Sequence, residues 1–151
     1  MKRKILSMLS MMLCTASLVN AQDATTYRGA FAPAPEAMWT NTWTNWNPQA
    51  SAYGTANVNV SGSISSNTTW TSNNVYLLQG LVYIDSLVTL TIQPGTIIHG
   101  DFNTPNSSLI VRRGAKLIAE GTVCNPIVFT SNRAAGQRGL GDWGGIIMLG
   151  R

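Results

Sequence analysis

The sequence between positions 90 and 131 contains one short apolar template twice. Each copy has two apolar residues five and three positions before a glycine, and a third apolar residue three positions after it. The template residues are Leu90, Ile92, Gly95 and Ile98 in the first copy, and Leu109, Val111, Gly114 and Leu117 in the second. Apolar residues two positions apart point to the same face of a strand, and glycine permits a sharp corner between strands. The spacing between the two copies is typical of the short repeats of a stacked solenoid.

This template predicts an all-β chain whose repeats share one core. We expect the apolar residues of both copies to point into that core, with Leu90 stacked near Leu109. The stretch VYLLQGLVYI repeats the strand–glycine–strand arrangement earlier in the chain. Ile127 follows Leu109, and Ile147 follows Ile127, at nearly the same spacing as that between the two copies, which extends the apolar pattern. The pattern leaves open whether Ile127 begins a new rung or forms a second side of the same rung.

Residues 1–21 have the features of a secretory signal peptide. Three basic residues follow the first methionine, and the apolar run after them ends at Leu13 and is too short to span a bilayer. We expect cleavage after Ala21, so that the mature chain begins at Gln22, has no transmembrane segment and is exported to the extracellular medium or the outer cell surface. Lipid attachment at Cys14 is the alternative, but a leucine precedes it where a small residue is expected.

The net charge of +4 depends on this signal, because three of the ten basic residues lie in it. Seven basic and six acidic residues remain after cleavage, so the basic character gives no reason to expect nucleic-acid binding. The remaining chain is long enough for one core. The low charged fraction of the full sequence, 11%, and its many Thr, Ser, Asn and Gly residues indicate an extracellular all-β protein with many turns.

Residues 22–56 lack strand alternation and are predicted to be a linker and a Trp-rich segment before the β-helix rungs of residues 57–151. The aromatic residues of this segment are Trp39, Trp43, Trp46 and Tyr53. They can form a glycan-binding platform, because aromatic rings stack on the apolar faces of sugars. They can also cap the first rung, since a solenoid needs covered ends and large rings cover apolar area efficiently. Of the two, we favour the cap.

Five stretches resemble, in this order, a family of secreted or surface β-helix proteins from Bacteroidetes and related bacteria: NTTWTSNNVYLLQGLVYI, LTIQPGTIIHGD, SLIVRRGAKLIAEGT, NPIVFTS and GDWGGIIMLG. The resemblance covers residues 38–151 and implies a right-handed parallel β-helix of the pectin-lyase-like type. The sequence stops directly after an apolar strand without a polar cap, which would leave strand edges and core exposed. We therefore expect it to be the N-terminal part of a longer protein with further rungs.

Polysaccharide lyases that share the implied fold commonly use clustered acidic residues for calcium, together with an Arg or Lys base. Residues of these types are Asp101, Asp142, Arg112, Arg113, Lys116, Arg133 and Arg138. The acidic residues are isolated in sequence, whereas a calcium site needs several oxygen ligands. His99 is the only histidine, and a Ser-His-Asp triad would need it. Its position beside a glycine corner predicts an exposed side chain instead.

Cys124 is the only cysteine left after cleavage. We expect it to be a small buried apolar side chain. A reactive thiol, or half of a bridge to another chain, is the alternative.

The sequence thus offers no catalytic site, no metal site and no cofactor motif. It predicts an exported β-helix protein with a structural, adhesive or glycan-binding role, whose partner is a polysaccharide of the cell surface or surroundings. The alternative is a secreted polysaccharide-acting lyase or hydrolase whose active site lies on the β-helix or in further rungs.

Overall fold

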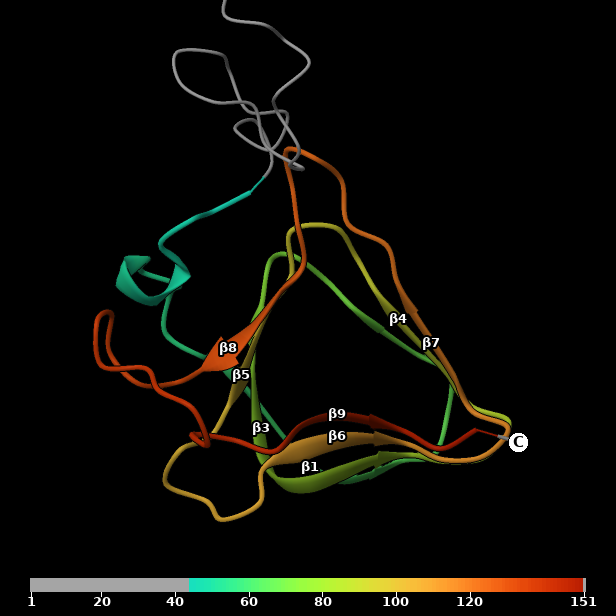
Figure 1. Cartoon of the computed structure of the whole chain (residues 1–151). Coiled ribbons are helices and arrows are strands. Elements are labelled where there is room, and N and C mark those ends of the chain that lie inside the picture. Colours follow the sequence, from blue (N-terminus) through green and yellow to red (C-terminus); the bar gives the residue numbers. More distant parts are fainter. Residues whose placement is uncertain (1–43, 151) are drawn as a thin grey trace, which may run out of the picture. The chain divides into compact units, whose positions relative to one another are not determined.

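A computed structural model describes residues 44–150 of the chain (Figure 1). Within this range it contains nine strands and one 3-10 turn. The elements are η2 (Pro48–Ala50), β1 (Val58–Ile64), β2 (Thr68–Trp70), β3 (Val75–Ile84), β4 (Thr89–Ile92), β5 (Ile97–Gly100), β6 (Ser108–Val111), β7 (Lys116–Ala119), β8 (Val128–Ser131) and β9 (Gly145–Met148). Among these residues, no helix is long and apolar enough to cross a membrane.

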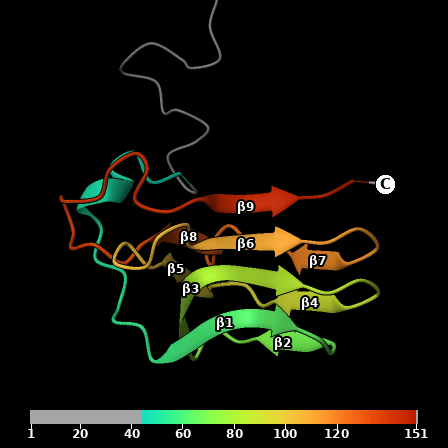
Figure 2. The same ribbon diagram turned by 90° about the horizontal axis from the view of Figure 1, so that it is seen from below.

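The strands lie along three sides of a triangle (Figure 1). The first halves of β1 and β3 lie with β5 and β8 on one side, and their second halves lie with β6 and β9 on the next. The third side consists of β2, β4 and β7. Every pairing is parallel, because the chain returns to each side one layer further along, as Figure 2 shows for β1, β3, β6 and β9.

Two of the corners are the predicted glycine corners. Gly95 turns the chain between β4 and β5, and Gly114 turns it between β6 and β7, both with φ of +80°. A side chain at such a φ is strained, whereas glycine adopts it freely. The strand–glycine–strand prediction for these two sites is therefore confirmed.

The register corrects the prediction that Leu90 stacks near Leu109. Leu90 pairs with Leu117 of β7, which lies beyond Leu109 in the chain. Leu109 pairs instead with Val82 of β3 and with Ile146 of β9. The two template copies are two different corners of the triangle rather than the same corner in successive layers. The two copies are two sides of the triangle apart rather than three, because each side repeats a similar strand and corner pattern.

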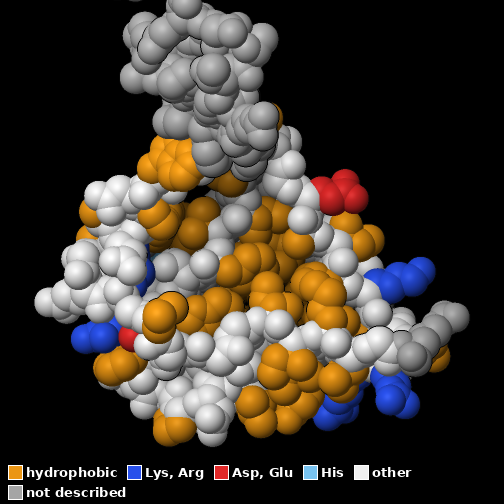
Figure 3. Space-filling model, viewed as in Figure 1, with side chains coloured by type: hydrophobic (Ala, Val, Ile, Leu, Met, Phe, Trp, Pro, Cys, Tyr) orange, Lys and Arg blue, Asp and Glu red, His pale blue; other side chains and the backbone are white. Residues whose placement is uncertain are grey.

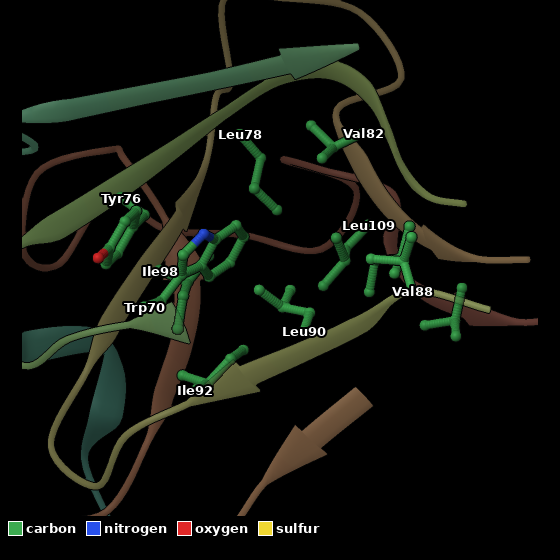
Figure 4. Packing of buried hydrophobic residues seen from close by; sticks show 11 residues of the cluster. Trp70, Tyr76, Leu78, Val82, Val88, Leu90, Ile92, Ile98 and Leu109 are labelled. Atoms are coloured by element: carbon green, nitrogen blue, oxygen red, sulfur yellow. The ribbon is translucent and has the colours of Figure 1, made fainter. Parts of the chain in front are cut away.

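The predicted shared core is confirmed. Leu90, Ile98 and Leu109 have no exposed surface and point toward one another inside the triangle (Figure 4). Leu117 is partly buried and packs against the same cluster. Removing a large apolar side chain of this kind from water is worth about 1.5–3 kcal/mol, so these contacts hold the three sides together.

An aromatic pair fills the core at the first layer. Trp70 of β2 is 3% exposed, and its ring stacks on that of Tyr76 with the centroids 4.7 Å apart. The hydroxyl of Tyr76 accepts a hydrogen bond from the backbone N–H of Thr71 at 2.9 Å. The pair therefore places two large rings inside the triangle without leaving the phenol oxygen unpaired.

The position of Ile127 is also settled by the structure. It directly precedes β8, which pairs with β5 on the side that also holds the first halves of β1 and β3. Ile147 lies in β9, which pairs with β6 on the next side. Counted from β1, Ile127 therefore stands at the start of a new rung, and Ile147 lies on the second side of that rung.

Candidate functional site

A pocket of about 480 Å³ lies on the outer face of the β3–β5–β8 side. Its walls come from residues 52–56, from Leu77 and His99 on the strands, and from residues 132–138. We call residues 44–56 the covering segment and residues 132–144 the β8–β9 loop. Both lie beside this face of the triangle (Figure 1), and the volume is within the range of about 300–1,000 Å³ that is usual for ligand sites.

His99 lies in the lining of this pocket, in register between Leu77 of β3 and Thr130 of β8. The neighbouring Ile98 points into the core, so His99 points outward. It is nevertheless only 4% exposed. The prediction that the His99 side chain is exposed is therefore wrong, because the covering segment and the β8–β9 loop lie over this face and shield the imidazole from water.

The imidazole of His99 is neutral at pH 7 and incompletely bonded. Burial, and second the charge of Arg138, lower the pKa of His99 below its ordinary value of 6.5. Its Nε2 atom is buried and has no hydrogen-bond partner among the described residues. A buried polar atom without a partner costs about 1–3 kcal/mol, which makes His99 the chemically distinctive group of the pocket.

Arg138 fastens the covering segment to the β8–β9 loop. Its Nη1 donates to three backbone carbonyls, those of Pro48 (3.2 Å), Gln49 (3.3 Å) and Ser51 (2.8 Å). Its Nε donates to the carbonyl of Ser131 at 3.3 Å, and its guanidinium carbon lies 5.0 Å from the ring centroid of Tyr53. The backbone N–H of Gly136 adds a bond of 2.7 Å to the carbonyl of Gln49. These bonds position the segment that walls the pocket.

The residues predicted to bind glycan are placed only in part. Trp39 and Trp43 lie outside the described residues. The side chain of Trp46 is 58% exposed, and Tyr53 is half-buried in the pocket wall. Their role in glycan binding, and the capping of the first rung, stay predictions.

The carboxylate of Asp101 is used to order the loop that follows β5. It is 5% exposed and accepts hydrogen bonds from the hydroxyl of Thr104 (2.6 Å), the N–H of Asn103 (3.0 Å) and the amide of Asn132 (2.8 Å). Burial raises the pKa of Asp101, but the hydrogen bonds, that of Thr104 above all, outweigh burial and lower it below 3.8. Asp101 is therefore an ionised anchor.

The carboxylate of Asp142 likewise orders the β8–β9 loop. It accepts a hydrogen bond of 2.9 Å from the N–H of Gly139 and forms an ion pair of 3.3 Å with Arg133. The bond from Gly139 is the main cause that lowers the pKa of Asp142. Asp101 and Asp142 thus hold two neighbouring loops, and the amide of Asn132 joins the first of these loops to the start of the second.

The other charged candidates lie away from the pocket. Arg112 and Arg113 follow β6 and are exposed, and Lys116 is exposed at the start of β7. Arg112 pairs with Asp85 at 2.7 Å and lies 4.4 Å above the ring centroid of Tyr83. Both arginines thus lie on an exposed turn outside the pocket lining. Within residues 44–150, no group of three or more His, Cys, Asp and Glu side chains is arranged to hold a metal ion.

The prediction of a buried Cys124 is wrong. Its thiol is exposed, because Cys124 lies in the connection between β7 and β8 rather than in a strand of the core.

Sequence reasoning missed Asn132 altogether. Its amide oxygen accepts a bond of 2.8 Å from the N–H of Phe102, while its amide nitrogen donates to Asp101, and the residue lines the pocket. Nothing in the local sequence distinguishes it from the other asparagines of the loops. Trp143 of the β8–β9 loop contacts Gly100 of β5, where an added Cβ would come within 2.4 Å of the indole.

The family model described as pectate-lyase-like beta helix domain matches residues 62–151. The matched residues include His99, Arg133 and Arg138, and the covering segment precedes them. No curated protein and no solved structure matches the chain.

Proposed function

This chain belongs to the pectate-lyase-like beta helix domain family, and we propose that it is an exported binding protein of the cell surface or extracellular medium. Its β-helix serves as a rigid frame, and the pocket on the β3–β5–β8 side holds part of a glycan. The proposal includes a right-handed solenoid, an aromatic cap on the first rung and cleavage of residues 1–21.

The observation that carries this function is the Nε2 of His99, which has no partner among the described residues, at a pocket with mixed apolar and polar walls. A sugar hydroxyl is both a donor and an acceptor of hydrogen bonds. It can therefore complete the bonding of either tautomer of the imidazole once the covering segment gives way. The ring of Tyr53 and the side chains of Thr55 and Asn132 supply the mixture of apolar and polar surface that orients a small ligand.

The test is a titration of the tag-free protein with neutral oligosaccharides, followed by the NMR signals of its single histidine. We expect saturable shifts of the His99 signals. Tyr53→Ala should weaken binding by about tenfold, since buried aromatic contacts are worth about 1 kcal/mol or more. The matched control is Tyr83→Ala, which removes a ring that also lies under an arginine but outside the pocket. Equal affinities of these two variants, or the absence of shifts, would refute glycan binding in the pocket.

The alternative, a polysaccharide-acting enzyme, has one observation in its favour. A buried neutral imidazole with a free nitrogen is suited to take up a proton during catalysis. The test is incubation with plant and bacterial polysaccharides, followed by assays for new reducing ends and for the absorbance of a newly formed C=C bond. Product that is lost in His99→Gln would replace the binding proposal with this one.

A further inference from the structure

The charges around the pocket are unbalanced. Arg133 and Arg138 are among its lining residues, and no Asp or Glu is. Arg133 is paired with Asp142 on one nitrogen. Among residues 44–150, no carboxylate lies within ion-pair distance of Arg138. Within the described part of the chain, one positive charge of the pocket wall therefore has no compensating carboxylate.

The guanidinium group of Arg138 also has hydrogen-bond donors that no described residue uses. Its Nη1 and Nε bond to backbone carbonyls, which are neutral, and its Nη2 has no hydrogen-bond partner among the described residues. Arg133 uses Nη1 for Asp142, and its guanidinium carbon lies 4.4 Å from the ring centroid of Phe102. The ion pair and the ring contact fix the orientation of Arg133, and the carbonyl bonds fix that of Arg138, so little side-chain freedom is left to lose on binding a ligand.

We propose that this pocket binds an oxyanion, that is, a phosphate, sulfate or carboxylate group, between the guanidinium groups of Arg138 and Arg133. Guanidinium groups bind such groups through charge-assisted hydrogen bonds, which are about twice as strong as neutral ones. The pocket is partly shielded from water, so the attraction is screened less than on an open surface. This inference uses the pocket of the proposed function but does not require that the ligand be a sugar.

The bound oxyanion has a measurable effect on His99. Burial and the charge of Arg138 disfavour the imidazolium, and an anion beside Arg138 offsets the second of these influences. The neighbours of His99 on the strands, Leu77 and Thr130, carry no charge, and Tyr53 on the covering segment is a neutral phenol. On the loops, Arg133 is paired with Asp142, and Asp101 is bonded to Asn132.

These charges determine how anion binding and the protonation of His99 affect each other. A bound anion raises the pKa of His99, so anion binding is accompanied by proton uptake. At pH values well above the pKa of His99 in the complex, the affinity for the oxyanion does not depend on His99. The affinity increases as the pH falls from the pKa of His99 in the complex to its lower pKa in the free protein.

The experiment titrates the tag-free full chain with inorganic phosphate, sulfate, glucose 6-phosphate, glucuronate and glucose. Sodium chloride keeps the ionic strength constant, and the His99 NMR signals and calorimetry report binding. We expect the oxyanions, but not glucose, to raise the pKa of His99. Arg138→Gln should weaken oxyanion binding by about tenfold or more, since a hydrogen bond to a charged group is worth about 1.5–3 kcal/mol. Arg113→Gln, which removes the same charge from an exposed turn, should change it less than about twofold.

Arg138 also holds the covering segment, so the loss of that contact is controlled separately. Arg138→Lys keeps the charge and removes the forked geometry, and it should retain the pKa rise of His99 with oxyanions. If Arg138→Gln weakens glucose and phosphate binding equally, charge is not what the pocket recognises and the inference is refuted. If no oxyanion binds while neutral sugars do, the inference fails and glycan binding stands. Binding of oxyanions but not of glucose supports the inference and refutes recognition of neutral glycan.

The source of the oxyanion follows from the same panel. Tighter binding of glucose 6-phosphate than of inorganic phosphate would identify a charged group carried by a sugar, whereas equal affinities would identify the free anion. Both results support the oxyanion site.

Discussion

At the scale of single residues, the behaviour of His99 is set by its neighbours in space rather than by its neighbours in sequence. The strand β5 directs the side chain outward, and the covering segment and the β8–β9 loop then bury it. The same two segments bring Arg138 close enough to disfavour the imidazolium. A residue that looks like a solvated rung position in the sequence is thus a neutral, buried base.

His99 should make stability depend on pH in a defined window. Between its pKa of 6.5 in the unfolded chain and its lower pKa in the folded protein, the unfolded state binds more protons. The free energy of unfolding therefore decreases as the pH falls from about 6.5. Urea unfolding between about pH 8 and pH 5 should show this decrease in the wild type and a flatter profile in His99→Gln. Asp101 and Asp142, whose folded pKa values lie below 3.8, contribute to acid unfolding only at lower pH. Parallel profiles of the two proteins would contradict the prediction.

Gly100 is required by the indole that lies against it. Gly100→Ala places a methyl group 2.4 Å from the Trp143 ring, so the indole must move and the contact between β5 and the β8–β9 loop must loosen. We expect a loss of about 1–3 kcal/mol of stability, measured by urea unfolding and by the change in tryptophan fluorescence. Gly150→Ala is the control, because a Cβ there meets no atom within 4 Å and should change stability by less than about 0.5 kcal/mol. Equal stabilities would mean that Trp143 does not pack on Gly100.

At the scale of elements, the three sides of the triangle are regular while their connections are not. The sequence distance between paired residues increases from the β3–β5 pairing to the β5–β8 pairing, and it is larger again for the β6–β9 pairing. The additional residues lie in the loops after β5, β7 and β8. The bond between Asn132 and Asp101 ties the loop after β8 to the loop after β5, and Arg138 ties the loop after β8 to the covering segment. The regular strands thus form the frame, and the covering segment and the β8–β9 loop form most of the pocket wall.

The register predicts that replacing Leu109 and replacing Leu117 by alanine lower the stability by different amounts. In the sequence template, Leu109 corresponds to Leu90 and Leu117 corresponds to Ile98. Leu109 lies between β3 and β9 and has no exposed surface, so Leu109→Ala should cost about 2–5 kcal/mol. Leu117 lies on the outermost strand of its side and is only partly buried, so Leu117→Ala should cost clearly less. Denaturant unfolding of the two variants at one temperature measures this order. A reversed order would mean that β7 is more deeply covered than the pairing shows.

At the scale of the whole described unit, one end of the triangle is open. Met148 pairs with the inward-facing Val111 yet is 69% exposed, and Ile147 and Leu149 are 43% and 48% exposed. Figure 3 shows the apolar side chains that gather in the middle of the triangle. Among the described strands, β9 has a partner on one edge only. An unpaired strand edge beside apolar surface is a template for association.

Residues 22–151 produced alone should therefore associate through β9. Met148→Lys should shift sedimentation toward the monomer, because a charge at this position disfavours burial against a second chain. The control is Leu87→Lys, which changes an apolar residue that is 89% exposed in a turn away from β9. A wild-type monomer at the same concentration, or an equal effect of both substitutions, would contradict association through β9.

The local sequence determined the strands, the glycine corners and the inward-facing residues, because these depend on the period of two along a strand and on the freedom of glycine at positive φ. Leu90, Ile98 and Gly95 could be assigned from such spacing alone. The layer in which each strand lies could not, because loop length is free to vary while backbone pairing fixes the register. For the same reason, the register partner of Leu90 is Leu117 rather than Leu109.

The pocket was decided only by the tertiary structure. Tyr53, His99 and Arg138 come from three segments that are far apart in sequence, and no local pattern relates them. Arg138 joins them because its guanidinium reaches the backbone carbonyls of Pro48, Gln49 and Ser51, groups that every residue type carries and that leave no signature in the sequence. The identity of the side chains came from the sequence. The burial that makes His99 neutral, and the surroundings of Arg138 in which no described carboxylate pairs with it, exist only after the covering segment and the β8–β9 loop meet over β5.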